Sequence, residues 1–177
     1  MSKAAPQRRH PCEGSLLERA HAEDESIVAA PITIAAGMLV ALVLATDGLM
    51  HAYWATGGIW PASNRLSLVQ VVLNSNKVES FRPAILAPLA AMLLLGALTV
   101  LAQVHALGRI DQLVPDQLLR GATIAVAAAL LLRGLVGAVW IFSLFGSSST
   151  PFYRVNLILY TPACLVLFAA AIAAASR

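Results

Sequence analysis

Charged residues are scarce in this sequence of 177 residues. Asp, Glu, Lys and Arg together make up 12% of the chain, whereas hydrophobic residues make up 59%. An ordinary soluble domain has about 25% charged residues, so this composition excludes that class. The net charge of +3 comes from basic residues scattered over the tail and loops. Without a basic face, the sequence predicts no nucleic-acid partner.

Motifs of several enzyme classes are absent as well. The two cysteines, Cys12 and Cys164, form no Cys-x-x-Cys pair, which argues against a thiol–disulfide oxidoreductase of the four-helix membrane type. There is no His-Glu-x-x-His zinc motif, no Gly-x-Ser-x-Gly turn and no glycine-rich phosphate loop. His51 and His105 are expected near opposite membrane faces, so they do not form a haem ligand pair. We therefore predict neither a metal site nor a cofactor.

The sequence does contain four long apolar segments. They cover about residues 31–54, 83–105, 122–145 and 153–175. A membrane-spanning helix needs about 20 mostly apolar residues, so we predict an all-α membrane protein, a bundle of four transmembrane helices. This domain takes up residues 28–177. Residues 1–27 form a polar tail, in which a short helix is expected from Leu16 to about Ile27.

The connection between the first two spans, residues 55–82, is unusually long. Loops of this length usually have a function of their own, so we expect it to fold over the bundle. Its apolar middle, residues 66–73, is expected to lie on the membrane surface or to form a short strand. The sequence Asn74-Ser75-Asn76 then predicts a turn.

The distribution of positive charge predicts the orientation in the membrane. One side of the bilayer receives Lys3, Arg8, Arg9, Arg19, Arg109, Arg120 and Arg177, and the other side receives Arg65, Lys77, Arg82 and Arg154. The side with more basic residues is normally cytoplasmic. Both termini are therefore predicted to lie in the cytoplasm.

Polar residues inside the predicted spans are the candidate site. Asp47 and His51 lie one helical turn apart in the first span, Arg133 lies in the third, and Asn156 and Tyr160 lie in the fourth. A charge at the centre of a membrane helix costs about 2.5–3.5 kcal/mol on insertion scales. We therefore predict an ion pair between Asp47 and Arg133, with His51 and Tyr160 hydrogen-bonded beside it. Asp47, His51, Arg133 and Tyr160 are the candidate catalytic residues, with His51 as a general base.

Aromatic residues gather where the first span ends. Tyr53, Trp54 and Trp60 are typical of the belt at a membrane interface. Together with Asn156 they are the candidate ligand-binding residues. In the third span, Gly134 and Gly137 favour close approach of a neighbouring helix.

Three functions remain open for such a protein. The first is binding of a lipidic or amphipathic small molecule, or acid–base chemistry on it, in a polar pocket near the outer leaflet. The second is a structural or accessory subunit, in which the polar residues only lock helices together and the partner is a membrane protein or a second copy of the chain. The third is a small proton-linked transporter that uses Asp47.

Three stretches resemble one known family. Residues 51–61, HAYWATGGIWP, resemble the H-x-Y-W-A-x-G-G-x-W signature of the DUF3995 family of small bacterial membrane proteins. Residues 131–134, LLRG, resemble its mid-helix arginine motif, and residues 152–165, FYRVNLILYTPACL, resemble its F-x-x-x-D-x-x-x-Y-S-P-L-C-L ending. Asn156 stands where the family commonly has an acid, and Ala163 replaces a leucine. The resemblance covers about residues 35–170. It implies a multi-pass protein of the bacterial inner membrane and carries no established activity.

Overall fold

The computed structural model describes residues 12–141 and 151–176, and every regular element in these ranges is helical. The chain divides into two units, residues 1–32 and residues 33–177. In the first unit, the helix α1 (Cys12–Ala55) begins at Cys12, earlier than the start at Leu16 that the sequence predicted.

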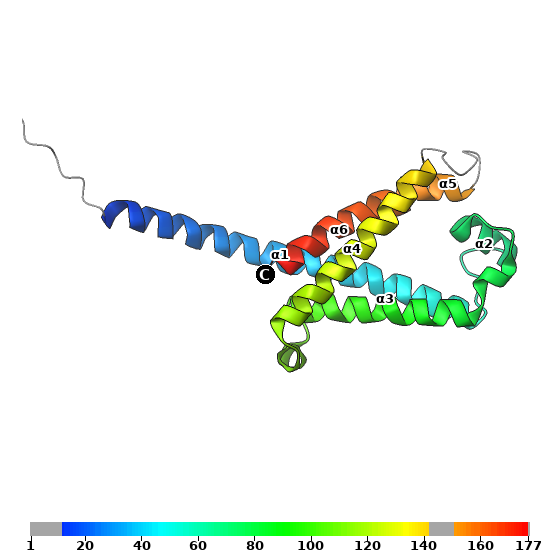
Figure 1. The fold of residues 1–177 in the computed structure, drawn as a ribbon, viewed down its shortest axis with the longest axis horizontal. Coiled ribbons are helices and arrows are strands. Elements are labelled where there is room, and N and C mark those ends of the chain that lie inside the picture. Colours follow the sequence, from blue (N-terminus) through cyan, green and yellow to red (C-terminus); the bar gives the residue numbers. More distant parts are fainter. Residues whose placement is uncertain (1–11, 142–150, 177) are drawn as a thin grey trace, which may run out of the picture. The chain divides into compact units, whose positions relative to one another are not determined.

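Four helical segments are long and apolar enough to cross a membrane, which confirms the predicted fold class (Figure 1). They are Ala30–Ala55 of α1, Pro83–Gln103 (α3), Asp116–Val139 of α4 (Asp116–Ile141) and Phe152–Ala175. The last segment combines α5 (Pro151–Val155), the π-helical turn η3 (Asn156–Tyr160) and α6 (Thr161–Ala175).

The third span begins at Asp116 rather than near residue 122. The Pro115 carbonyl accepts hydrogen bonds from the backbone N–H groups of Leu118 and Leu119, which starts the helix on a charged, polar turn. Hydropathy alone does not detect such a turn because it reports only the apolar part of a helix. The predicted end of this span, residues 142–145, lies outside the described residues.

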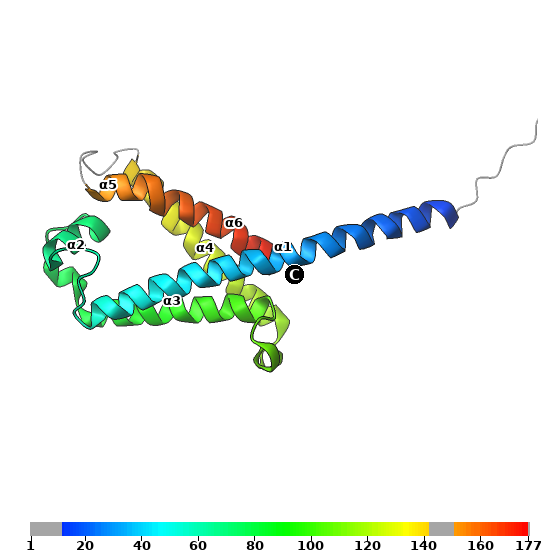
Figure 2. The ribbon, with the colours of Figure 1, turned by 180° about the vertical axis from the view of Figure 1, so that it is seen from behind.

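Small and branched apolar residues form the core of the bundle. α4 and α6 pack along each other and α3 packs against α4 (Figures 1 and 2). The buried residues are Val40, Ala41, Leu44, Ala97, Val100, Val104, Ala127, Leu130, Leu167, Ala171 and Ala174. Large apolar side chains such as Leu42, Met92 and Ile158 are exposed instead. This arrangement is typical of membrane helices, whose small residues face one another while large ones face lipid.

The two glycines of the third span allow α4 and α6 to come close, as predicted. A Cβ atom at Gly134 would stand 3.1 Å from Leu165 Cδ2, and one at Gly137 would overlap the hydroxyl oxygen of Thr161. Both neighbours belong to α6.

The connection between the first two spans is also helical, so the alternative of a short strand is wrong. α2 (Arg65–Leu73) is capped by Asn64, whose side chain accepts a hydrogen bond from Ser67 N at 2.9 Å. It ends at Asn74, which adopts a left-handed conformation with φ of 51° and forms the predicted turn. This cap and the packing described next outweigh the preference of β-branched residues for strands.

A second buried cluster joins this connection to the bundle. Its members are Trp54, Leu68, Val69, Phe81 and Leu86. They come from α1, α2, the short helix η1 (Val78–Phe81) and α3, and Arg65 donates a further hydrogen bond to the Phe81 carbonyl at 3.2 Å. The connection therefore folds back onto the ends of α1 and α3, as expected from its length.

Candidate functional site

Arg133 on α4 lies beside α6 and the turn before it. Its Nη1 and Nη2 atoms both donate to Oδ1 of Asn156, at 3.3 and 3.4 Å. Its guanidinium carbon also lies 5.4 Å from the centre of the Tyr160 ring, a distance at which a cation is attracted to an aromatic face. Roughly 12 Å of helix separates Arg133 from Ile141, so the residue lies in the half of the span nearest α5.

Asn156 is fully buried and connects the two helices through both ends of its amide. Oδ1 accepts from Arg133, while Nδ2 donates to the Gly137 carbonyl at 2.7 Å. The Cβ position that Gly137 leaves open lies 3.1 Å from Asn156 Oδ1 and 3.2 Å from Arg133 Nη1, and close to Thr161 Oγ1. Three polar groups thus converge on one point of α4. We call Arg133, Gly137, Asn156, Tyr160 and Thr161 the arginine cluster.

The π-helical turn η3 explains how Asn156 and Thr161 reach the same point. The backbone N–H of Thr161 bonds to the Asn156 carbonyl, five residues earlier. In an α-helix, with 3.6 residues per turn, residues five apart would diverge, whereas the wider turn aligns them. The cause is local, since Pro162 has no N–H for the carbonyl four residues before it and cannot continue a regular α-helix.

Asp47 and His51 form a second polar group, which belongs to α1 alone. His51 Nδ1 lies 3.3 Å from Asp47 Oδ1 and 2.8 Å from the Asp47 backbone carbonyl oxygen. A carbonyl oxygen only accepts, so Nδ1 carries the hydrogen and Nε2 is left to exchange a proton. The His51 ring also meets Trp54 edge to face, with 5.0 Å between ring centres. We call Asp47, His51 and Trp54 the histidine cluster.

The predicted ion pair between Asp47 and Arg133 is not formed. Among the described residues, the ion pairs are His51 with Asp47 and Arg82 with Glu79. Asp47 instead contacts His51, one turn further along its own helix. Arg133 is hydrogen-bonded to the neutral amide of Asn156.

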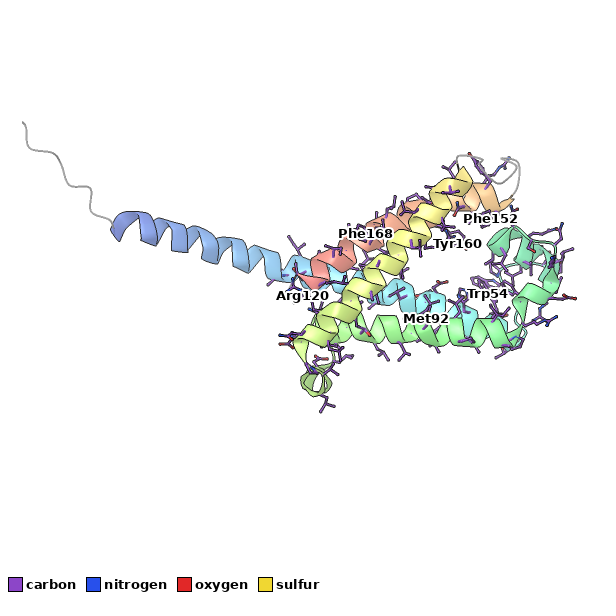
Figure 3. The ribbon with its side chains drawn as sticks, in the orientation of Figure 1. Trp54, Met92, Arg120, Phe152, Tyr160 and Phe168 are labelled. Carbon is purple, nitrogen blue, oxygen red and sulfur yellow. The ribbon has the colours of Figure 1, made fainter. Side chains whose placement is uncertain are left out.

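The three aromatic residues at the end of the first span differ in their surroundings. Trp54 is buried, and its indole N–H donates to the Trp60 carbonyl at 2.8 Å. The Trp60 side chain is 64% exposed, and the Tyr53 ring covers Gly58. Tyr160 and Trp54 lie on the sides of their helices that face each other (Figure 3).

A profile of one family, described as "Protein of unknown function (DUF3995)", matches residues 44–171. The chain belongs to the DUF3995 family. This confirms the resemblance found in the sequence, and the matched residues include every member of the arginine and histidine clusters. No curated protein and no solved structure matches the chain.

The structure of this DUF3995 chain adds functional candidates that the sequence analysis missed. Thr161 is buried, and its hydroxyl oxygen has no hydrogen-bond partner among the described residues. At the opposite end of the bundle, Gln103, Asp111 and Thr123 are buried with one unpaired oxygen each. The one sequence feature that could have pointed to Thr161 is Pro162, because a proline within a predicted span indicates an irregular turn next to it. The described residues hold no group of three potential metal ligands.

Proposed function

We propose that this DUF3995 protein binds the polar group of a lipidic or amphipathic small molecule between its arginine and histidine clusters. The observation that carries the proposal is Arg133. It is a permanent cation inside a candidate membrane span, and its hydrogen-bond and aromatic partners among the described residues are neutral. A purely structural role is better served by a neutral side chain, because a charge at this depth costs about 2.5–3.5 kcal/mol.

The histidine cluster gives this site a group that can move protons. Nδ1 of His51 is held by Asp47, so the ring is fixed in one tautomer and Nε2 is the atom that reacts. Acid–base chemistry on the bound molecule would therefore begin at His51, with Asp47 holding the ring. α2 packs on Trp54 of the histidine cluster and would limit access of water to this end of the proposed site.

The setting of this site is part of the proposal. The excess of Lys and Arg on the side of the termini supports cytoplasmic termini in a bacterial inner membrane. The two clusters then lie in the outer half of the bilayer, on the side of α2. Residues 28–177 would form the membrane domain, preceded by a cytoplasmic tail.

Native mass spectrometry of the protein released from lipid nanodiscs tests the binding role. We expect an amphipathic adduct on the wild type, its loss in Arg133→Met, and its retention in Arg154→Met. Arg154 is a suitable control because it is exposed and lies on α5, close in sequence to the cluster. Equal adducts on all three proteins would contradict the proposal.

A structural or accessory role is the alternative, and the close contact of α4 and α6 at Gly137 favours it. This alternative predicts that Arg133→Met markedly lowers the thermal stability of the protein. Its binding to a partner protein or to a second copy of the chain would be unchanged. Use of Asp47 in proton-linked transport would instead appear as uptake that Asp47→Asn abolishes.

A further inference from the structure

The charge of Arg133 indicates what kind of polar group the site takes. We infer that the arginine cluster selects an anionic head group, a carboxylate or a phosphate, carried on an alkyl or acyl chain. This inference rests on the proposed function and adds the chemical class of the ligand to it.

The first argument is the hydrogen-bonding capacity of Arg133. A guanidinium has five N–H donors, and the two contacts that the described residues make with it go to a single oxygen. Their lengths, 3.3 and 3.4 Å, exceed the distance of about 2.7–2.9 Å typical of bonds between ions. The amide of Asn156 therefore orients the guanidinium without using up its capacity for an anion.

The second argument is the pairing of charges around the cluster. Asp47, the acid of the histidine cluster, contacts His51 on its own helix. Arg133 forms no ion pair among the described residues, so its positive charge is left without an adjacent counter-charge. A ligand that carries its own negative charge compensates it, whereas a cationic ligand would increase the repulsion.

The third argument is the chemistry of the neighbouring groups. Thr161 and Tyr160 contribute hydroxyl groups, which donate hydrogen bonds to oxyanions, and the Thr161 hydroxyl has no partner among the described residues. No carboxylate belongs to the arginine cluster. The hydrogen-bond donors of the cluster therefore match the acceptor-only surface of a carboxylate or phosphate.

The apolar part of the ligand is inferred from the residues that flank the cluster. Leu132 and Ile158 are neighbours in sequence to the cluster and are 63% and 75% exposed. Both lie within candidate spans, where exposed side chains contact hydrocarbon. The cluster lies within the same spans, so a chain attached to the bound anion can extend into the hydrocarbon, which favours an amphipathic anion over a free inorganic one.

Binding of matched amphiphiles tests the inference on the full chain. The protein is placed in nanodiscs of phosphatidylcholine and titrated with laurate, dodecyl phosphate, dodecanol or dodecyltrimethylammonium, and binding is followed by native mass spectrometry. We expect the two anions to bind at least about ten-fold more tightly than dodecanol, and the cation to bind most weakly. Displacement by phosphatidic acid would identify a membrane lipid as the source of the anion, and resistance to displacement would identify a free amphiphile.

Variants of Arg133 separate this inference from the proposed function. Arg133→Gln is expected to lose the preference for anions, Arg133→Lys to keep most of it because the charge remains, and Arg154→Gln to leave it unchanged. Equal binding of dodecanol and laurate, both lost in Arg133→Gln, would contradict anion selection and leave the binding role intact. Binding that no Arg133 variant changes would contradict both. If Arg133→Gln does not fold, Arg133→Lys still tests the inference. Because it preserves the charge, it should still bind laurate more tightly than dodecanol, and loss of this preference would contradict anion selection.

Discussion

The arginine and histidine clusters differ in what holds them together. Asn156 of the arginine cluster is fully buried and bonds to both a side chain and a backbone carbonyl of α4, so the cluster exists only when α4 and α6 are packed. The histidine cluster is built within α1, with Asp47 half exposed and His51 12% exposed. The first is a product of tertiary structure, while the second depends on helical spacing. Substitutions should therefore affect folding mostly at the first cluster and chemistry mostly at the second.

The largest loss of stability is expected for Gly137→Ala. The added Cβ overlaps the Thr161 hydroxyl and presses on Asn156 and Arg133, so these side chains, or α6 itself, must shift. Overpacking of this kind costs about 1–3 kcal/mol, to be measured as a lower midpoint of thermal unfolding in detergent.

Gly121→Ala is the matched control for that substitution. Gly121 belongs to the same helix, α4, and a Cβ there meets nothing within 4 Å. Replacing glycine by alanine in a helix is favourable by about 0.5–1 kcal/mol, so the control should be unchanged or more stable. Equal losses in both variants would show that the contact at Gly137 does not hold the helices together.

A somewhat smaller loss is expected for Asn156→Leu. It removes the acceptor for Arg133 and the donor for the Gly137 carbonyl, and a buried polar group left without its partner costs about 1–3 kcal/mol. Asn156→Asp should cost less, because the carboxylate pairs with Arg133 even though the donor to Gly137 is lost. Chemical unfolding of the two variants gives the comparison, and a greater loss for Asp than for Leu would contradict this account of Asn156.

The same amide explains a departure that the sequence analysis found. The resemblance described above implies an acid at the position of Asn156, and the sequence offered no reason for the change. In this chain the residue faces a guanidinium on one side and a carbonyl oxygen on the other. An amide supplies an acceptor and a donor at once, whereas an ionised carboxylate only accepts.

The sequence predicts contacts within one helix, as in the histidine cluster, better than contacts between helices, as in the arginine cluster. The contact of His51 with Asp47 is local and follows from a spacing of four residues in a helix. The partner of Arg133 could not be predicted, because it depends on the π-helical turn before Pro162 and on the close approach at Gly137. Charge alone predicted Asp47 as the partner of Arg133, although the buried amide of Asn156 lies nearer to the guanidinium. The four spans were predictable since length and apolar composition decide them.

The connection between the first two spans offers an intermediate test. Asn64→Ala removes the side-chain cap of α2, which costs about 1 kcal/mol at a typical helix start. We expect this loss to appear locally, as faster hydrogen exchange of residues 65–73 and unchanged exchange of α4. Protection that stays the same in α2 would mean that its packing on Trp54, and not its cap, holds it in place.

The smallest effect on stability is expected for His51→Gln. The ring contacts Asp47 within one helix and Asp47 is half exposed, and pairs of this kind contribute about 0.3–0.5 kcal/mol. Gln keeps a donor for the Asp47 carbonyl but cannot take up a proton. The unfolding midpoint should thus be nearly unchanged, while any proton transfer to a bound amphiphile is lost. If His51→Gln instead unfolds the protein as readily as Gly137→Ala, the histidine cluster is as much a part of the packing as the arginine cluster, and the difference between the two disappears.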